Sequence, residues 1–129
     1  MALIGGVAIL LLAGCAREDV GALRSAARKG VFPTTLVSAE AAKIYTGALF
    51  AGGRVDQVRV GLRGYLVIFH HGSGIPVIRI AVYRRSWWDW KLVAEPRPPV
   101  PEFMHAVAAD GRIIVVEEQS GRKWPLYEP

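Results

Sequence analysis

Two adjacent histidines and a serine occur together in the segment His70-His71-Gly72-Ser73-Gly74. Adjacent residues of a strand point to opposite faces of a sheet, so these two imidazoles cannot easily bind one metal ion together. Zinc sites use three or four convergent ligands, and only His105 remains as a third histidine. The serine hydrolase motif G-x-S-x-G needs glycine where His71 stands, and a helix after it. We interpret the segment as a glycine-rich hairpin loop and expect no metal and no cofactor.

The carboxylates do not form a recognisable catalytic pair. Most of them are scattered singly over the chain, among them Asp56, Asp89, Glu95, Glu102, Asp110, Glu117 and Glu118. The adjacent pair Glu117-Glu118 fits a polar strand end better than an acid–base pair. The sequence contains no phosphate-binding loop and no dinucleotide fingerprint. We therefore predict that the protein is not an enzyme.

The densest cluster of aromatic and basic side chains is YRRSWWDW, residues 83–90. Alternation along a strand predicts that Trp88 and Trp90 face the core and that Trp87 faces the other way. An exposed tryptophan beside arginine is typical of a binding interface, and arginine can stack on its ring. The alternative is that Trp87 folds back over the sheet edge. As a partner-binding surface we predict the set Trp87, Tyr83, Arg79 and Arg59, with Arg63 beside it.

The only cysteine, Cys15, follows an uncharged apolar run that begins at Met1. The run is short for a transmembrane helix, which needs about 20 residues, and suits the apolar region of a signal peptide. The tetrapeptide Leu12-Ala13-Gly14-Cys15 resembles the lipobox of bacterial lipoproteins. This resemblance covers residues 1–15 alone, and no family is recognised for the mature domain. The alternative is a short buried helix with a core cysteine.

The lipobox resemblance implies a location. In such lipoproteins the cysteine sulfur receives a diacylglycerol, the chain is cleaved before the cysteine, and the new amine is usually acylated, often with palmitate. Ala16 in place of aspartate after the cysteine implies the outer membrane, with the protein facing the periplasm. A lipidated Cys15 also leaves no thiol for a disulfide or a nucleophile. The domains predicted are a signal peptide over 1–14, a lipidated tether over 15–33 and one folded domain over 34–129.

The composition fits one domain that needs no disulfide. The formal net charge is +5, and twelve of the sixteen basic residues are arginine. Together with abundant Gly, Ala, Val and Pro, this reflects a GC-rich genome. We therefore expect no nucleic-acid binding, although a basic surface suits anionic lipid or polysaccharide.

The periodicity predicts an α+β fold with one amphipathic helix on an antiparallel meander sheet. Residues 38–51 carry an N-cap serine, Ser38, and an apolar stripe at helical spacing. From Arg54 the period changes to two, and four strands follow with short connections, of which 65–69 is apolar throughout, as in a central strand. We expect the helix to cover one sheet face and a single core to hold Ile44, Leu49, Val60, Ile68, Ile80 and Trp90.

The flanking segments are less regular. Residues 16–33 predict a tether with a little helix, and the proline-rich residues 95–101 predict a stiff extended arm. Residues 102–109 are ambiguous between helix and strand. Residues 112–118 and 123–127 predict a C-terminal hairpin in which Pro125 marks an edge strand.

Three functions fit these observations. The first is a small membrane-anchored envelope lipoprotein that binds another envelope protein, as an accessory module of a complex such as a secretion or conjugation system. The second is a periplasmic inhibitor or immunity-type lipoprotein that neutralises a toxin or lytic enzyme. The third is a cell-wall glycan-binding protein. We favour the first; neighbouring genes would distinguish it from the second.

Overall fold

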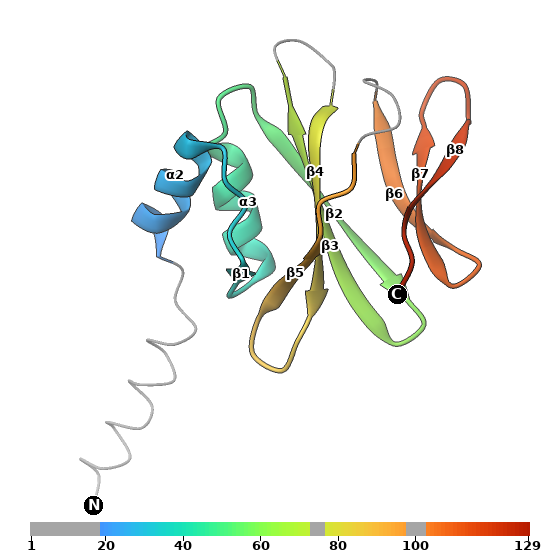
Figure 1. Ribbon diagram of the computed structural model, residues 1–129, viewed down its shortest axis with the longest axis horizontal. Coiled ribbons are helices and arrows are strands. Elements are labelled where there is room, and N and C mark those ends of the chain that lie inside the picture. The colour runs from blue at the N-terminus through green and yellow to red at the C-terminus, as the bar shows by residue number, and fades with distance from the viewer. Residues whose placement is uncertain (1–18, 73–76, 98–102) are drawn as a thin grey trace, which may run out of the picture.

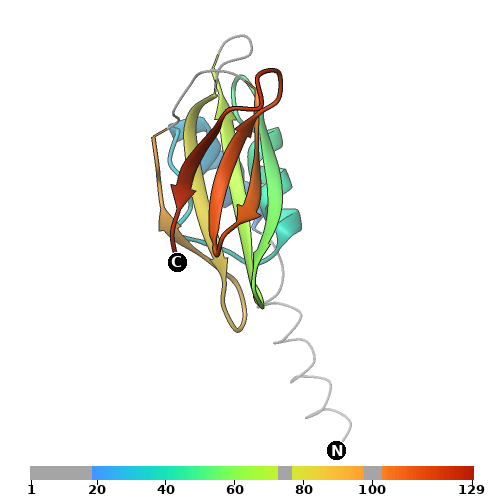
Figure 2. The ribbon, with the colours of Figure 1, turned by 90° about the vertical axis from the view of Figure 1, so that its right-hand side faces the viewer.

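The computed structural model describes residues 19–72, 77–97 and 103–129, which form three layers (Figure 1). Two helices cover one face of a five-stranded antiparallel sheet, and a three-stranded antiparallel sheet covers the other face. Figure 2 shows the smaller sheet in front and the helices behind. The predicted α+β class with an antiparallel meander is confirmed, and the second sheet is an addition to it.

Each helix begins after an N-cap side chain that accepts a backbone hydrogen bond. Helix α2, Val20–Lys29, has Asp19 as N-cap, whose carboxylate accepts from Ala22 N at 3.0 Å. It ends at Gly30, whose φ of 69° suits a residue without a Cβ. Helix α3, Ala39–Gly47, starts after the predicted cap Ser38, whose hydroxyl accepts from Ala41 N at 3.0 Å. The predicted extent 38–51 is wrong at its C-terminal end, since helix α3 ends at Gly47.

The five-stranded sheet has the order β1-β5-β4-β3-β2. Its strands are β1 Thr35–Leu36, β2 Gly53–Val60, β3 Arg63–His71, β4 Val77–Arg85 and β5 Trp90–Ala94. Strands β2 to β5 form the predicted meander, each paired antiparallel with the next. The short strand β1 adds to the edge of β5, with Leu36 opposite Trp90.

The second sheet has the order β6-β7-β8, with β6 Met104–Ala109, β7 Arg112–Glu117 and β8 Lys123–Tyr127. Strands β7 and β8 form the predicted C-terminal hairpin, and Pro125 lies in an edge strand as expected. The ambiguous segment 102–109 is largely strand β6. Of the proline-rich arm, residues 98–101 lie outside the described residues, and 95–97 belong to no helix or strand.

The central strand β3 explains why the sheet needs cover on both faces. Its residues Tyr65–Phe69 are all buried, and alternation sends them to opposite sides. Leu66 and Ile68 pack beneath the helices, whereas Val67 and Phe69 pack beneath the smaller sheet. The molecule therefore has two hydrophobic cores, one in each interlayer space.

The prediction of one common core is therefore wrong. Leu49, Ile68 and Trp90 are buried in the helix-side core, with half-buried Ile44 against it. Ile80 is buried in the core between the sheets, and Val60 is half-buried at its border. Alternation assigns residues of one strand to two faces, and here each face has a core of its own.

The fold also starts earlier than the predicted boundary at residue 34. Leu23, Ala27 and Phe32 are buried in the helix-side core, so most of the segment predicted as tether belongs to the folded domain. Residues 1–18, with the predicted signal peptide and Cys15, lie outside the described residues.

Two side chains of β2 join the sheets at one edge. Asp56 accepts a hydrogen bond from Ala106 N at 2.9 Å, and Arg54 donates to Met104 O. Arg54 and Asp56 also pair with each other at 3.3 Å. The carboxylate and the guanidinium thus satisfy backbone groups of edge strand β6 that no neighbouring strand satisfies.

Candidate functional site

Trp87 and Trp88 lie side by side in the turn between β4 and β5. Ser86 N donates to Asp89 O at 2.7 Å, which closes a tight turn before β5 begins at Trp90. Trp87 is 88% exposed, as predicted. The prediction that Trp88 faces the core is wrong, because Trp88 is 84% exposed. Strand alternation does not extend into a turn, so both indoles project from it.

A second exposed apolar residue lies at the same end of the sheet. Leu62 follows Gly61, whose φ is 62°, in the two-residue turn between β2 and β3, and its side chain is fully exposed. Arg63 follows this turn at the start of β3, and Arg85 precedes the β4–β5 turn at the end of β4. These two strand ends are neighbours, since Tyr65 pairs with Arg84. Both turns therefore project from one end of the sheet, at the bottom of Figure 1.

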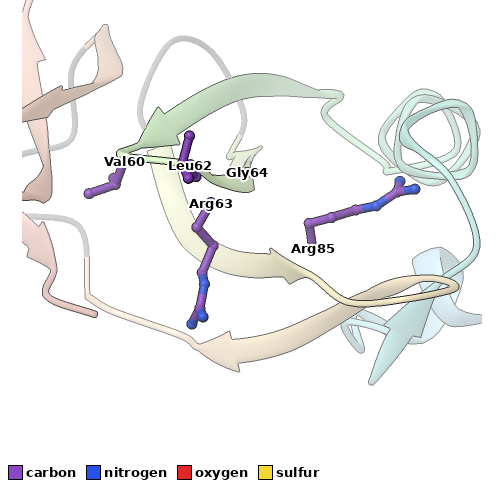
Figure 3. Close-up of a pocket in the computed structure, with 5 residues that line it drawn as sticks. All are labelled: Val60, Leu62, Arg63, Gly64 and Arg85. Atoms are coloured by element: carbon purple, nitrogen blue, oxygen red, sulfur yellow. The ribbon is translucent and has the colours of Figure 1, made fainter.

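Arginines surround these apolar side chains. One hollow of about 550 Å³ lies beside Leu62 and is lined by Arg63 and Arg85, and another of about 460 Å³ beside Trp87 is lined by Arg63, Arg84 and Arg85. Figure 3 shows Arg63 and Arg85 extending in different directions from their strands. Arg59 is exposed opposite Gly64, near the same turn. We define the hairpin tip as Leu62, Trp87 and Trp88 with Arg59, Arg63, Arg84 and Arg85.

Tyr83, predicted to lie on this exposed surface, is fully buried, and that prediction is wrong. Its hydroxyl donates to Pro33 O at 2.6 Å, and burial raises its pKa far above the usual value of 10. The helices cover the sheet face that Tyr83 points to from β4, so its side chain lies in the helix-side core.

Arg79 also lies away from the hairpin tip, at the end of helix α2. It donates to Gly30 O, pairs with Glu95 at 2.9 Å and stacks over the Phe32 ring at 4.5 Å. Its guanidinium thus fastens the segment after α2 to the sheet. Of the four predicted residues, only Trp87 and Arg59 are exposed at this end of the sheet.

Sequence reasoning missed Leu62, Trp88, Arg84 and Arg85 as members of this surface. The tight turn Ser86–Asp89 was the missing information, because it moves Trp88 out of the strand. For Leu62 the signal was available, since Gly61 and Gly64 flank it and a glycine pair around a short segment is typical of a turn.

The histidines form no centre among the described residues. His70 and His71 end β3 and are half-buried, and burial lowers the pKa of both, assisted by Arg79 for His70 and by Arg54 for His71. His105 lies at 3.6 Å from Glu118. No group of three His, Cys, Asp or Glu that could hold a metal ion occurs in residues 19–72, 77–97 and 103–129. Ser73 and Gly74 lie outside the described residues.

Glu117 is a buried carboxylate with a structural role. It accepts from the Ser120 hydroxyl and lies at 3.5 Å from Arg122. Its backbone N donates to Arg122 O at 2.8 Å, and its O accepts from Gly121 N. The residue thus organises the turn between β7 and β8.

No protein-family model, no curated protein and no solved structure matches this chain. Within the described part of the chain, no helix is long and apolar enough to span a membrane.

Proposed function

We propose that the protein is a lipid-anchored binding module of the bacterial cell envelope, and that the hairpin tip is its contact surface. In this proposal Cys15 carries the lipid, the anchored chain sits at the outer membrane facing the periplasm, and the chain has no catalytic role. The lipobox resemblance of residues 12–15 supports the anchor, and the hairpin tip supports binding.

The observation that carries the proposal is the pair of exposed indoles, Trp87 and Trp88, together with exposed Leu62 on the other turn at the same end of the sheet. Large apolar side chains gathered on one surface are unfavourable in water unless another surface covers them. Tryptophan and arginine are also the residues that dominate binding energy at interfaces. The fold presents them on two short turns of one rigid sheet, so little ordering is needed when a partner binds.

The proposal is tested by photo-crosslinking in native membranes. A photoreactive amino acid at position 87 should give a specific crosslinked product in cells that make the protein. The matched control is position 50, since Phe50 is 96% exposed and precedes β2, at the opposite end of that strand from Leu62. A product at position 87 and none at position 50 supports the proposal. Equal products, or none at position 87, contradict it.

The partners weighed from the sequence stay predictions. They are an envelope protein of a secretion or conjugation system, a toxin or lytic enzyme, and a cell-wall glycan. The mass of the crosslinked product distinguishes them, because the two protein partners add tens of kilodaltons in a discrete band, whereas a glycan gives a heterogeneous product.

A further inference from the structure

The arginines of this protein fall into two groups. Arg54, Arg79 and Arg122 each pair with a carboxylate at 2.9 to 3.5 Å. Among the described residues, none of the four hairpin-tip arginines forms an ion pair with a carboxylate, although Arg85 stacks on the Trp90 ring at 5.3 Å. Residues 59–64 and 84–91 hold five basic side chains and one carboxylate, Asp89. The hairpin tip is thus a concentrated positive surface that suits an anionic partner.

The apolar members of the hairpin tip suit the boundary of a bilayer. Tryptophan is enriched at the membrane–water interface, because its ring is apolar and its N–H can hydrogen-bond. Leucine and tryptophan beside basic residues are typical of surfaces that dip into the headgroup region of anionic membranes. Here the apolar side chains occupy the turns themselves, and Arg59 and Arg63 flank one of them on exposed strand ends.

The start of helix α2 lies at the same end of the fold. Its N-cap Asp19 lines an apolar groove together with Leu36, and Leu36 pairs with Trp90, the first residue after the β4–β5 turn. The other end of α2 lies at Arg79, whose guanidinium bonds Gly30 O. Figure 1 shows the same polarity, with α2 starting on the side toward which the two turns point.

The chain between Cys15 and helix α2 is short. Only residues 16–19 separate Cys15 from Val20, a span of at most about 18 Å when fully extended. A lipid on Cys15 would therefore hold this end of the domain, with its hairpin tip, close to the bilayer surface.

We propose that the hairpin tip docks on the anionic phospholipid surface in which Cys15 is anchored. The arginines contact lipid phosphates, and Leu62, Trp87 and Trp88 enter the headgroup region. This inference rests on the proposed function and names the partner of the same surface. Docking holds the domain in one orientation, with the opposite end of the sheet directed away from the membrane.

The test uses residues 16–129, which carry both cores and every described element but no lipid site. This chain should co-sediment with vesicles of phosphatidylglycerol and phosphatidylethanolamine and should not bind pure phosphatidylcholine vesicles. Binding should weaken as the salt concentration rises from about 0.05 to about 0.5 M, because salt screens the attraction between exposed arginines and lipid phosphates. Trp87→Ala/Trp88→Ala should lower the apparent affinity more than tenfold.

The controls separate the hairpin tip from general stickiness. Phe50→Ala removes an equally exposed ring and should bind as the unmodified chain does. Arg63→Glu and Lys123→Glu change the net charge equally. Lys123 lies at the end of β8 away from the hairpin tip, because the other end of β8 packs Tyr127 against Tyr65. Only Arg63→Glu should weaken binding more than tenfold, and it keeps the test valid if the double tryptophan variant fails to fold.

Absence of binding to anionic vesicles overturns the inference, as does equal binding by the Arg63→Glu and Lys123→Glu variants. A protein product at position 87 in the native crosslinking, with no vesicle binding, also overturns it and leaves the proposed function standing. If vesicle binding depends on the hairpin tip and crosslinking yields lipid, both are supported.

Discussion

Trp87 and Trp90 are three residues apart and have opposite roles. Trp87 is 88% exposed, whereas Trp90 is buried against Gly64 and below Arg85. Alternation placed both correctly, but it failed for Trp88 between them, because a turn intervenes. Regular alternation alone did not fix exposure, since Tyr83 lies within strand β4 and is nevertheless buried.

Trp87→Ala should change the free energy of unfolding by less than about 0.5 kcal/mol, as for an exposed residue without structural contacts. Trp90→Ala should cost about 3–5 kcal/mol, because it empties part of the helix-side core. Urea unfolding followed by circular dichroism measures both. A loss above about 2 kcal/mol for Trp87→Ala would show that this indole is structural.

Two buried tyrosines, Tyr83 and Tyr65, differ in whether their hydroxyl forms a hydrogen bond. Tyr83→Phe removes the donor to Pro33 O and should cost about 1–2 kcal/mol. Tyr65 is buried too, but its hydroxyl has no hydrogen-bond partner among the described residues. Tyr65→Phe should therefore be neutral or slightly stabilising in the same denaturation measurement. A larger loss for Tyr65→Phe than for Tyr83→Phe would contradict this assignment.

Tyr45 gives the fold a dependence on alkaline pH. Its hydroxyl donates to Val31 O at 2.9 Å, and burial raises its pKa from 10.0 to about 12, partly opposed by Arg79. The folded state keeps this proton more tightly than the unfolded state, so the contribution is complete below pH 10 and is lost as pH rises toward 12. The free energy of unfolding should fall over that window, and Tyr45→Phe should reduce the slope. An unchanged slope would assign the alkaline loss to other groups.

At the scale of elements, local sequence patterns predicted most of the helices and strands. The cap at Ser38, the meander from β2 to β5 and the hairpin with Pro125 follow from spacing and turn residues. The end of α3 and the nature of β6 did not, because both depend on tertiary contacts. Leu49 lies beyond the end of α3 and is buried in the helix-side core. Strand β6 is positioned by hydrogen bonds between its backbone and β2 side chains.

The contact between β2 and β6 is therefore testable by one substitution. Asp56→Ala leaves Ala106 N without its acceptor and Arg54 without its carboxylate, and should cost about 1–3 kcal/mol. Glu118→Ala removes an exposed carboxylate near His105 and should cost less than about 0.5 kcal/mol. Hydrogen exchange should also show faster exchange of β6 amides in Asp56→Ala alone. Equal exchange in both variants would mean that Asp56 does not hold the sheets together.

At the scale of the whole molecule, the third layer was the main feature that the sequence analysis missed. Strand Tyr65–Phe69 is apolar throughout, and a strand apolar on both faces requires cover on both. With the helix as the single cover, the opposite face was expected to be free and to carry Tyr83 and Arg79. Both faces are covered, and these two residues lie on the helix side. The hairpin tip was not predicted either, because it combines two turns that only the meander brings to the same end of the sheet.

The central claim is that the hairpin tip faces the membrane that holds the lipid anchor. It is tested most directly by tryptophan fluorescence of the lipidated protein in vesicles that contain brominated phospholipids. The account predicts that the lipids quench the wild-type fluorescence and that Trp87→Phe/Trp88→Phe loses most of this quenching, because Trp90 is buried and Trp124 half-buried. Quenching that is equally strong in the variant, or absent from the wild type, would contradict the account.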